Sequence, residues 1–184
     1  MTIEHVDAAC LDLTRNLRRR GAIVLAVFAL VWALAGGSGT PAALPIGVVA
    51  ALVSAGAVVL AFRGTAGPVT RTVRLPEKWN RGVGLVNAAE LVAVFAVIAA
   101  SNASGRPELI PIGIALVVGL HFFPLARLFD QGQYTWTAAL LTAVALAGLA
   151  ALAAGASAET VRAVVGLGAA LVLWGSSFHV ALRG

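Results

Sequence analysis

The chain has 184 residues, of which 60% are apolar and 11% are charged, whereas a soluble domain carries about 25% charged residues. This composition excludes a soluble globular protein and predicts an all-α, polytopic membrane protein. The formal net charge is +5, but the basic residues cluster where apolar stretches end, as they do beside lipid headgroups, so we expect the lipid bilayer and no nucleic acid as a partner.

Residues 1–20 predict an N-terminal amphipathic cytoplasmic segment. Apolar residues recur there at spacings of three and four, on one face of a helix: Ile3, Val6, Cys10, Leu13 and Leu17. Acidic residues come early and arginines late, as the helix dipole favours. We expect a short interfacial helix that leads into the first span, and the alternative is a docking helix for a partner. Ala33-Leu34-Ala35 resembles a signal-peptidase site, but with five further spans we expect an uncleaved first helix.

Residues 21–184 predict a six-helix transmembrane domain, because a bilayer core needs about 20 apolar residues per span. Glycine, proline, serine and asparagine mark most of the breaks. The six spans are placed near 21–36, 42–62, 83–101, 109–129, 134–156 and 160–182. The first is the shortest, and we expect it to continue backwards into the N-terminal segment.

Basic residues distinguish the two sides of the membrane. Of the 13 lysines and arginines, only Arg106 and Arg162 fall on one side. The other side receives Arg15, Arg18, Arg19, Arg20, Arg63, Arg71, Arg74, Lys78, Arg81, Arg127 and Arg183. The positive-inside rule therefore predicts that both termini are cytoplasmic. Because six short helices bury little lipid-facing surface, a homo-oligomer is also expected.

Glu90 is the clearest polar residue inside a span. It lies nine residues beyond Arg81, about 13 Å along a helix, which is near mid-membrane. Asn87, Gly84 and Asn80 share its face of the helix. An ionisable group in hydrocarbon costs several kcal/mol unless it is paired, hydrated or neutralised, so this face should point into the bundle or a water-filled cavity.

His121 should lie at a depth similar to that of Glu90 on the next span, because it precedes Arg127 by six residues, or about 9 Å. Consecutive spans joined by a short loop usually pack side by side. We therefore expect Glu90 to be protonated or hydrogen-bonded, directly or through one water, to His121 or Asn87. A Glu–His pair can share one proton, which removes the cost of a buried charge and suits a proton-linked mechanism.

These residues define a candidate ligand or proton site made of Glu90, His121 and Asn87, with His179, Arg127 and Asp130 as secondary candidates. The alternative is that Glu90 and His121 only join helices by hydrogen bonds. One Glu and one His are too few ligands for zinc, which needs three or four, so we expect no metal site. No catalytic residues and no cofactor are predicted from the sequence.

Aromatic residues near the helix ends have an alternative interpretation as well. Trp79, Tyr134 and Trp136 fall near the cytoplasmic ends of their spans. Such residues usually form the aromatic belt at the membrane interface, and we interpret them so in preference to ligand contacts.

The run Gly119-Leu120-His121-Phe122-Phe123-Pro124-Leu125-Ala126-Arg127 resembles one found in uncharacterised small bacterial membrane proteins. This resemblance implies a six-helix chain in the bacterial inner (cytoplasmic) membrane and no particular activity. The chain is also similar to Insig-type sterol-sensing proteins in the stretches Val92-Ala93-Val94-Phe95 and Phe129-Asp130. That similarity implies six spans, cytoplasmic termini and a lipid pocket among the helices.

Three functions are compatible with this sequence. The first is a small-solute transporter or permease with a proton-titratable site at Glu90 and His121. The second is a non-transporting protein that binds a lipid, a sterol or another small hydrophobic ligand, and the third is a membrane enzyme acting on a lipid. The shape of the cavity discriminates between the first two, because transport needs a pocket that reaches water, whereas a binder needs a slot open laterally to lipid.

Overall fold

The structure, a computed structural model, describes residues 3–64 and 78–183, and their regular structure is entirely α-helical. The helices are α1 (Ile3–Gly37), α2 (Ala43–Gly64), α3 (Trp79–Ala103), α4 (Leu109–Leu128), α5 (Gln133–Ala153) and α6 (Ala158–Arg183). All six are long and apolar enough to cross a membrane. The predicted all-α fold with six spans is therefore confirmed. Arg71 and Arg74 lie outside the described residues.

Helix α1 joins the N-terminal segment and the first span into one continuous helix. It runs through residue 20 without a break, and its apolar part extends from Leu11 to Gly37. The expected backward continuation of the first span is thus present. The side chains of the first ten residues, which include most of the apolar stripe expected there, lie outside the described residues.

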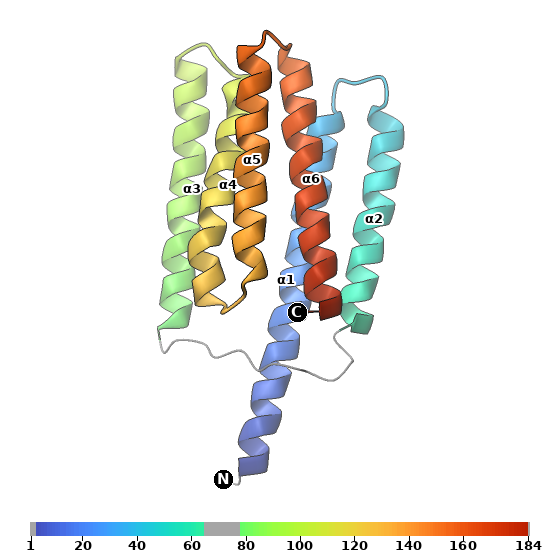
Figure 1. The fold of residues 1–184 in the computed structure, drawn as a ribbon, viewed down its shortest axis with the longest axis vertical. Helices are drawn as coiled ribbons and strands as arrows, with labels where there is room; N and C mark the ends of the chain where they lie inside the picture. The colour runs from blue at the N-terminus through green and yellow to red at the C-terminus, as the bar shows by residue number, and fades with distance from the viewer. Residues whose placement is uncertain (1–2, 65–77, 184) are drawn as a thin grey trace.

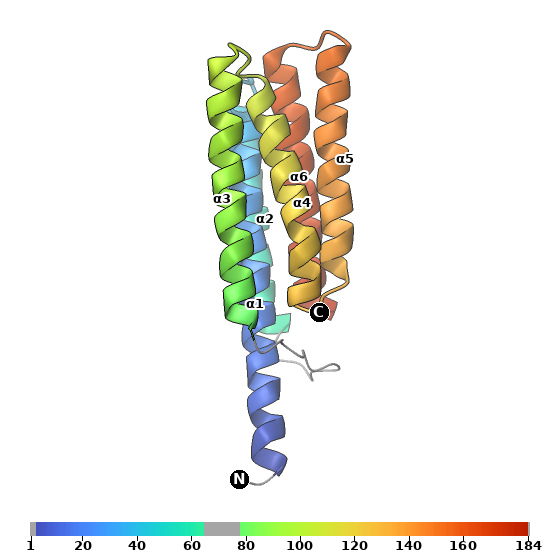
Figure 2. The same cartoon turned by 90° about the vertical axis from the view of Figure 1, so that its left-hand side faces the viewer.

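The helices are arranged so that α1 and α6 lie together near the middle of the bundle (Figure 1). Helix α2 packs against both of them, and α5 joins α6 to α4. Helix α3 lies at the edge, and among the described helices it packs only against α4 (Figures 1 and 2). The start of α1 and the end of α6 lie at the same end of the bundle.

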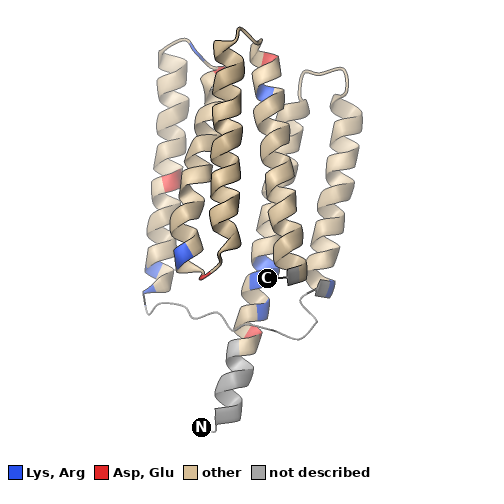
Figure 3. Cartoon of the chain, viewed as in Figure 1, with Lys and Arg blue, Asp and Glu red and all other residues tan. Residues whose placement is uncertain are grey.

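That end carries most of the charge and is called the basic end here (Figure 3). By their positions in the helices, the described basic side chains at this end are Arg15, Arg18, Arg19, Arg20, Arg63, Lys78, Arg81 and Arg127. The opposite end holds Arg106 and Arg162. The asymmetry predicted for the loops therefore exists in the fold, and the assignment of the basic end to the cytoplasm remains a prediction from it.

Small residues let α1 and α6 approach each other closely. Ala22, Ala29 and Ala33 line one face of α1 and are almost completely buried. At Gly36 an added Cβ would lie 2.8 Å from the backbone nitrogen of Leu167, so the two backbones nearly touch there. Without a hydrophobic drive between helices in lipid, this close packing is what holds helices together.

Hydrogen bonds reinforce the packing of α1, α2 and α6. The buried Ser177 hydroxyl donates to the carbonyl of Ala22 at 2.7 Å, and Ser54 donates to the carbonyl of Ala26 at 3.1 Å. The indole of Trp174 donates in turn to Ser54 at 2.9 Å. Because such bonds cross between helices, they fix the rotation of each helix about its axis as well as its distance.

Candidate binding site

Glu90 and His121 meet where α3 packs against α4. Glu90 Oε2 lies 3.4 Å from His121 Nδ1, and the side chains are 27% and 9% exposed, respectively. The His121 ring also lies near the backbone of Val86, one turn before Glu90. The contact that the depth argument predicts is therefore present, and one imidazole touches two successive turns of α3.

Close approach of α3 and α4 at both ends of their interface explains this meeting. An added Cβ at Gly113 of α4 would clash with Val97 of α3, and one at Gly82 of α3 would lie 2.9 Å from Leu128. Because glycine has no side chain, Val97 packs directly against the backbone of Gly113 and Leu128 against that of Gly82, which brings the two helices close together. Because the helices stay together along their length, residues at equal depth face each other.

The Glu90–His121 pair can carry one shared proton on either side chain. His121 Nδ1 is buried and has no hydrogen-bond partner among the described residues, since the approach of Glu90 lacks hydrogen-bond geometry. A neutral imidazole has one donor and one acceptor nitrogen. The pair can therefore hold one proton either as a carboxylic acid beside a neutral imidazole or as a carboxylate beside an imidazolium.

A cavity of about 510 Å³, called the main cavity here, opens beside this pair. Its volume falls in the roughly 300–1,000 Å³ range of small-molecule sites. It is lined by Leu17, Arg20, Gly21, Val24, Leu25, Phe28, Trp32, Trp79, Val83, Asn87, Glu90, Val118, His121, Phe122, Leu125, Phe129, Tyr134 and Leu173. Most of these side chains are apolar, so Glu90 and His121 are polar groups in a mainly apolar lining.

The main cavity runs from the basic end to the middle of the bundle. On α3 its lining extends from Trp79 to Glu90, and on α4 it extends from His121 and Val118 to the helix end. On α1, Val24 and Phe28 line it with 52% and 55% of their surfaces exposed, so the cavity is open on its α1 side. Since α3 does not pack against α1, the opening lies between these two helices.

Aromatic rings form one wall of the main cavity in an unbroken edge-to-face series. Trp79 contacts Phe129 with ring centroids 5.3 Å apart, and Phe129 contacts Tyr134 at 6.0 Å. Tyr134 contacts Phe122 at 5.5 Å, and Phe122 contacts His121 at 5.8 Å. Rings locked in this way give a rigid, apolar surface that leads from the basic end to the Glu90–His121 pair.

The other candidate residues are placed differently. Asn87 lines the main cavity and is exposed, but no hydrogen bond joins its side chain to Glu90 in the described structure. Arg127 and Asp130 do not line the cavity. His179 lies in a separate groove between α5 and α6, beside the 2.6 Å hydrogen bond of Thr137 and Ser176. Within the described residues, no three His, Cys, Asp or Glu side chains gather as metal ligands.

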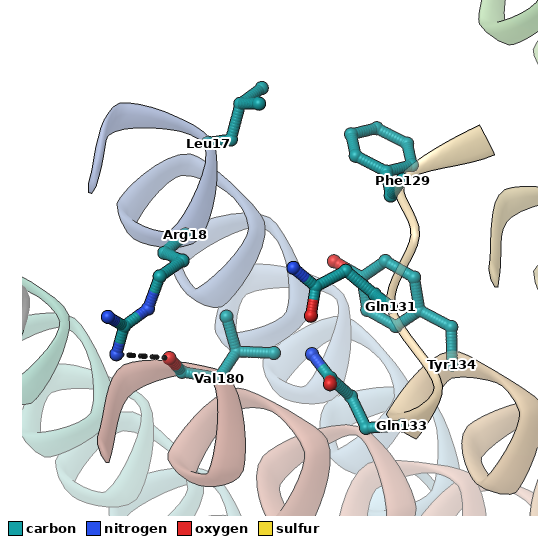
Figure 4. A pocket seen from close by; sticks show the side chains of 7 residues that line it. All are labelled: Leu17, Arg18, Phe129, Gln131, Gln133, Tyr134 and Val180. Carbon is teal, nitrogen blue, oxygen red and sulfur yellow. Dashed lines mark hydrogen bonds between the residues drawn. The ribbon is translucent and has the colours of Figure 1, made fainter. Parts of the chain in front are cut away.

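A much smaller space lies next to the main cavity at the basic end (Figure 4). Its volume of about 10 Å³ has room for about one water molecule. Figure 4 shows Arg18 reaching from α1 toward the end of α6, where it donates to the carbonyl of Val180 at 3.5 Å. The carbonyls in the last turn of a helix have no donor within the helix, and Arg18 supplies one for α6. Arg18 does not line the main cavity.

Several lining residues were not predicted from the sequence. Trp79 and Tyr134 were interpreted as interfacial belt residues, yet both line the main cavity, and Tyr134 is only 8% exposed. Trp136, interpreted in the same way, is 73% exposed, as a belt residue should be. The α1 residues that line the cavity, between Leu17 and Trp32, could not be predicted from the sequence. An apolar residue that faces lipid cannot be distinguished in the sequence from one that faces a cavity.

Comparison with known proteins places the site within a family. The model of a family of unknown function, DUF7010, matches residues 80–178, more than half of the chain. The matched region includes Glu90, His121 and Asn87 and excludes α1 and α2. No curated protein and no solved structure matches the chain, so the similarity to Insig-type proteins finds no support. The chain belongs to the DUF7010 family, whose function is unknown.

Proposed function

We propose that this membrane protein binds a lipid-like, amphipathic small molecule in the main cavity. The observation that carries the proposal is the cavity itself, which is apolar, open between α1 and α3, and provided with a polar pair at its inner end. An apolar chain would lie against the aromatic wall and α1. A hydroxyl, carbonyl or amide group on it would reach the Glu90–His121 pair.

The shape of the main cavity favours binding over passage through the bundle. On α3 the lining stops at Glu90, thirteen residues or about 20 Å before the helix ends at Ala103. On α4 it stops at Val118, and only on α1 does it come closer to the opposite end, where the buried Trp32 lies five residues before Gly37. A molecule that enters from the bilayer between α1 and α3 can therefore occupy the cavity without crossing to the opposite end.

The test uses a matched pair of cavity-filling variants. Val24→Trp places a large ring in the main cavity, whereas Val27→Trp adds the same ring on the same helix at a position that does not line the cavity. The two valines are similarly exposed, at 52% and 50%. Native mass spectrometry of the purified proteins should show an adduct that wild type and Val27→Trp retain and Val24→Trp loses. Equal retention by all three would contradict the proposal.

A second candidate is a proton-linked transporter of small solutes, which the 3.4 Å Glu90–His121 contact at the cavity wall favours. Glutamine keeps the shape of Glu90 and removes its titratable proton. Liposomes containing the protein and a trapped pH dye distinguish the two functions. Proton uptake by wild type and none by Glu90→Gln would favour transport, whereas no uptake by either protein, with the adduct retained, favours binding alone.

A further inference from the structure

The basic end of the main cavity has its own polar character, separate from the Glu90–His121 pair. Trp79 begins α3 and lies eleven residues before Glu90, about 16 Å along the helix. Arg20 of α1 lines the same end of the cavity. Its neighbour Gly21 lies against Tyr134, because an added Cβ there would be 3.0 Å from the tyrosine oxygen. The mouth of the cavity is thus formed by Arg20, Trp79 and Tyr134.

Two hydrogen-bond donors at this mouth, one buried and one exposed, have no acceptor on the protein among the described residues. The indole Nε1 of Trp79 is buried and has no hydrogen-bond partner among the described residues. The guanidinium of Arg20 is exposed, and no ion pair joins it to a described acidic side chain. Glu90, far along α3, is the only acidic residue among the described residues that line the cavity. A buried donor without an acceptor costs about 1–3 kcal/mol, so an oxygen-rich group would be stabilised here.

We propose that the mouth binds the anionic headgroup, a phosphate or a carboxylate, of a single-chain amphiphile whose tail occupies the main cavity. This inference rests on the proposed function and specifies its ligand. Arg20 supplies the charge and Trp79 supplies an N–H donor, while the apolar wall between them and the Glu90–His121 pair takes the chain. Basic pockets between membrane helices bind anionic lipid headgroups in this way.

The polarity of the site fixes the orientation of the ligand. The charged group stays at the basic end, where water and lipid headgroups are near, and the tail points toward mid-membrane. A cationic amphiphile would place its charge beside Arg20, which disfavours it by repulsion. A neutral alcohol of the same length would fill the same space and offer Arg20 a hydroxyl oxygen, but no negative charge.

The test compares three probes with the same alkyl chain in phosphatidylcholine nanodiscs: hexadecyl phosphate, hexadecanol and hexadecyltrimethylammonium. Binding is measured by native mass spectrometry as the fraction of protein that carries the probe. Hexadecyl phosphate should bind about tenfold more tightly than hexadecanol, the gain expected from one charge-assisted contact, and the ammonium probe should bind most weakly. Excess inorganic phosphate should not displace hexadecyl phosphate, and displacement would overturn the amphiphile in favour of a free-phosphate site.

Two variants assign the preference to named residues. Arg20→Gln should remove the preference for hexadecyl phosphate over hexadecanol. Arg63→Gln, an exposed arginine at the basic end that does not line the cavity, should leave both unchanged. Trp79→Phe keeps a ring beside Phe129 and removes the N–H, so it should weaken hexadecyl phosphate binding by a few-fold.

The outcomes separate this inference from the proposed function. If the phosphate and the alcohol bind equally to wild type, or if Arg20→Gln and Arg63→Gln behave alike, the headgroup inference is wrong and the main cavity remains a neutral lipid site. If none of the probes binds and Val24→Trp matches wild type, the proposed function itself is wrong.

Discussion

The two sides of this bundle are built differently. On one side α1, α2 and α6 are joined by buried alanines, touching glycine backbones and hydrogen bonds between helices. On the other side α3 has only α4 as a neighbour, and Ser101 is its only buried residue in the described structure. The first group therefore provides the scaffold, while the space left between α1 and α3 holds the candidate site.

The largest effect should come from closing the tightest contact in the scaffold. Gly166→Ala puts a methyl group into the backbone of Gly36, which cannot move aside as a side chain would. We expect a loss of about 3 kcal/mol in the free energy of unfolding, at the upper end of the usual cost of overpacking. Thermal unfolding in mild detergent measures it.

The control for this prediction lies on α3. Gly84 has no atom within 4 Å of an added Cβ, so Gly84→Ala should be neutral or slightly stabilising. If the two substitutions lowered the stability equally, the contrast between the two sides of the bundle would be wrong.

The next effect concerns the polar pair on the cavity side. Glu90→Leu leaves the buried Nδ1 of His121 without the one acidic side chain that contacts it among the described residues, and should lower the free energy of unfolding by about 2 kcal/mol. Glu90→Gln should retain the fold, because the amide keeps a polar group beside the imidazole, and should abolish any pH-dependent step. Denaturation of both variants, with hydrogen exchange of α3 and α4, checks this. A leucine variant as stable as wild type would show that the contact contributes nothing.

The smallest effect should follow from a single hydrogen bond in the scaffold. Ser177→Ala removes the bond to the carbonyl of Ala22, and bonds between membrane helices contribute about 0.6 kcal/mol on average. The exposed Thr135, changed to alanine, serves as the comparison at the surface. A small shift in the unfolding midpoint for Ser177→Ala and none for Thr135→Ala is the expected result. A larger shift for Thr135→Ala than for Ser177→Ala would show that the Ser177 hydrogen bond does not stabilise the packing of α1 against α6.

The sequence was sufficient for the parts of the fold that depend on distance along a helix. Apolar length identified six spans, and counting residues from Arg81 and Arg127 placed Glu90 and His121 at a common depth, where the structure brings them together. Depth follows from the fixed rise per residue, so these predictions needed no knowledge of tertiary packing.

Rotation about a helix axis could not be predicted in the same way. Helices that are apolar all round carry no periodic signal for the side that faces the bundle. Nothing in the sequence therefore placed Phe28 and Trp32 of α1 at the wall of a cavity, or separated Trp79, which lines the cavity, from the exposed Trp136. Asn87 shares a face with Glu90, yet it points into the cavity without bonding to the carboxyl group.

The central claim, that an alkyl chain enters the main cavity, is tested most directly at Trp32. This residue lines the cavity but is only 8% exposed, so chains in the surrounding bilayer barely reach it. In a protein with Trp79, Trp136 and Trp174 replaced by phenylalanine, a bromine-labelled single-chain amphiphile should quench Trp32 fluorescence in a saturable manner. The matching protein that keeps only the exposed Trp136 should show quenching that simply follows the bromine content of the bilayer. Quenching of Trp32 that is absent, or that follows bilayer content as Trp136 does, would contradict a chain in the cavity.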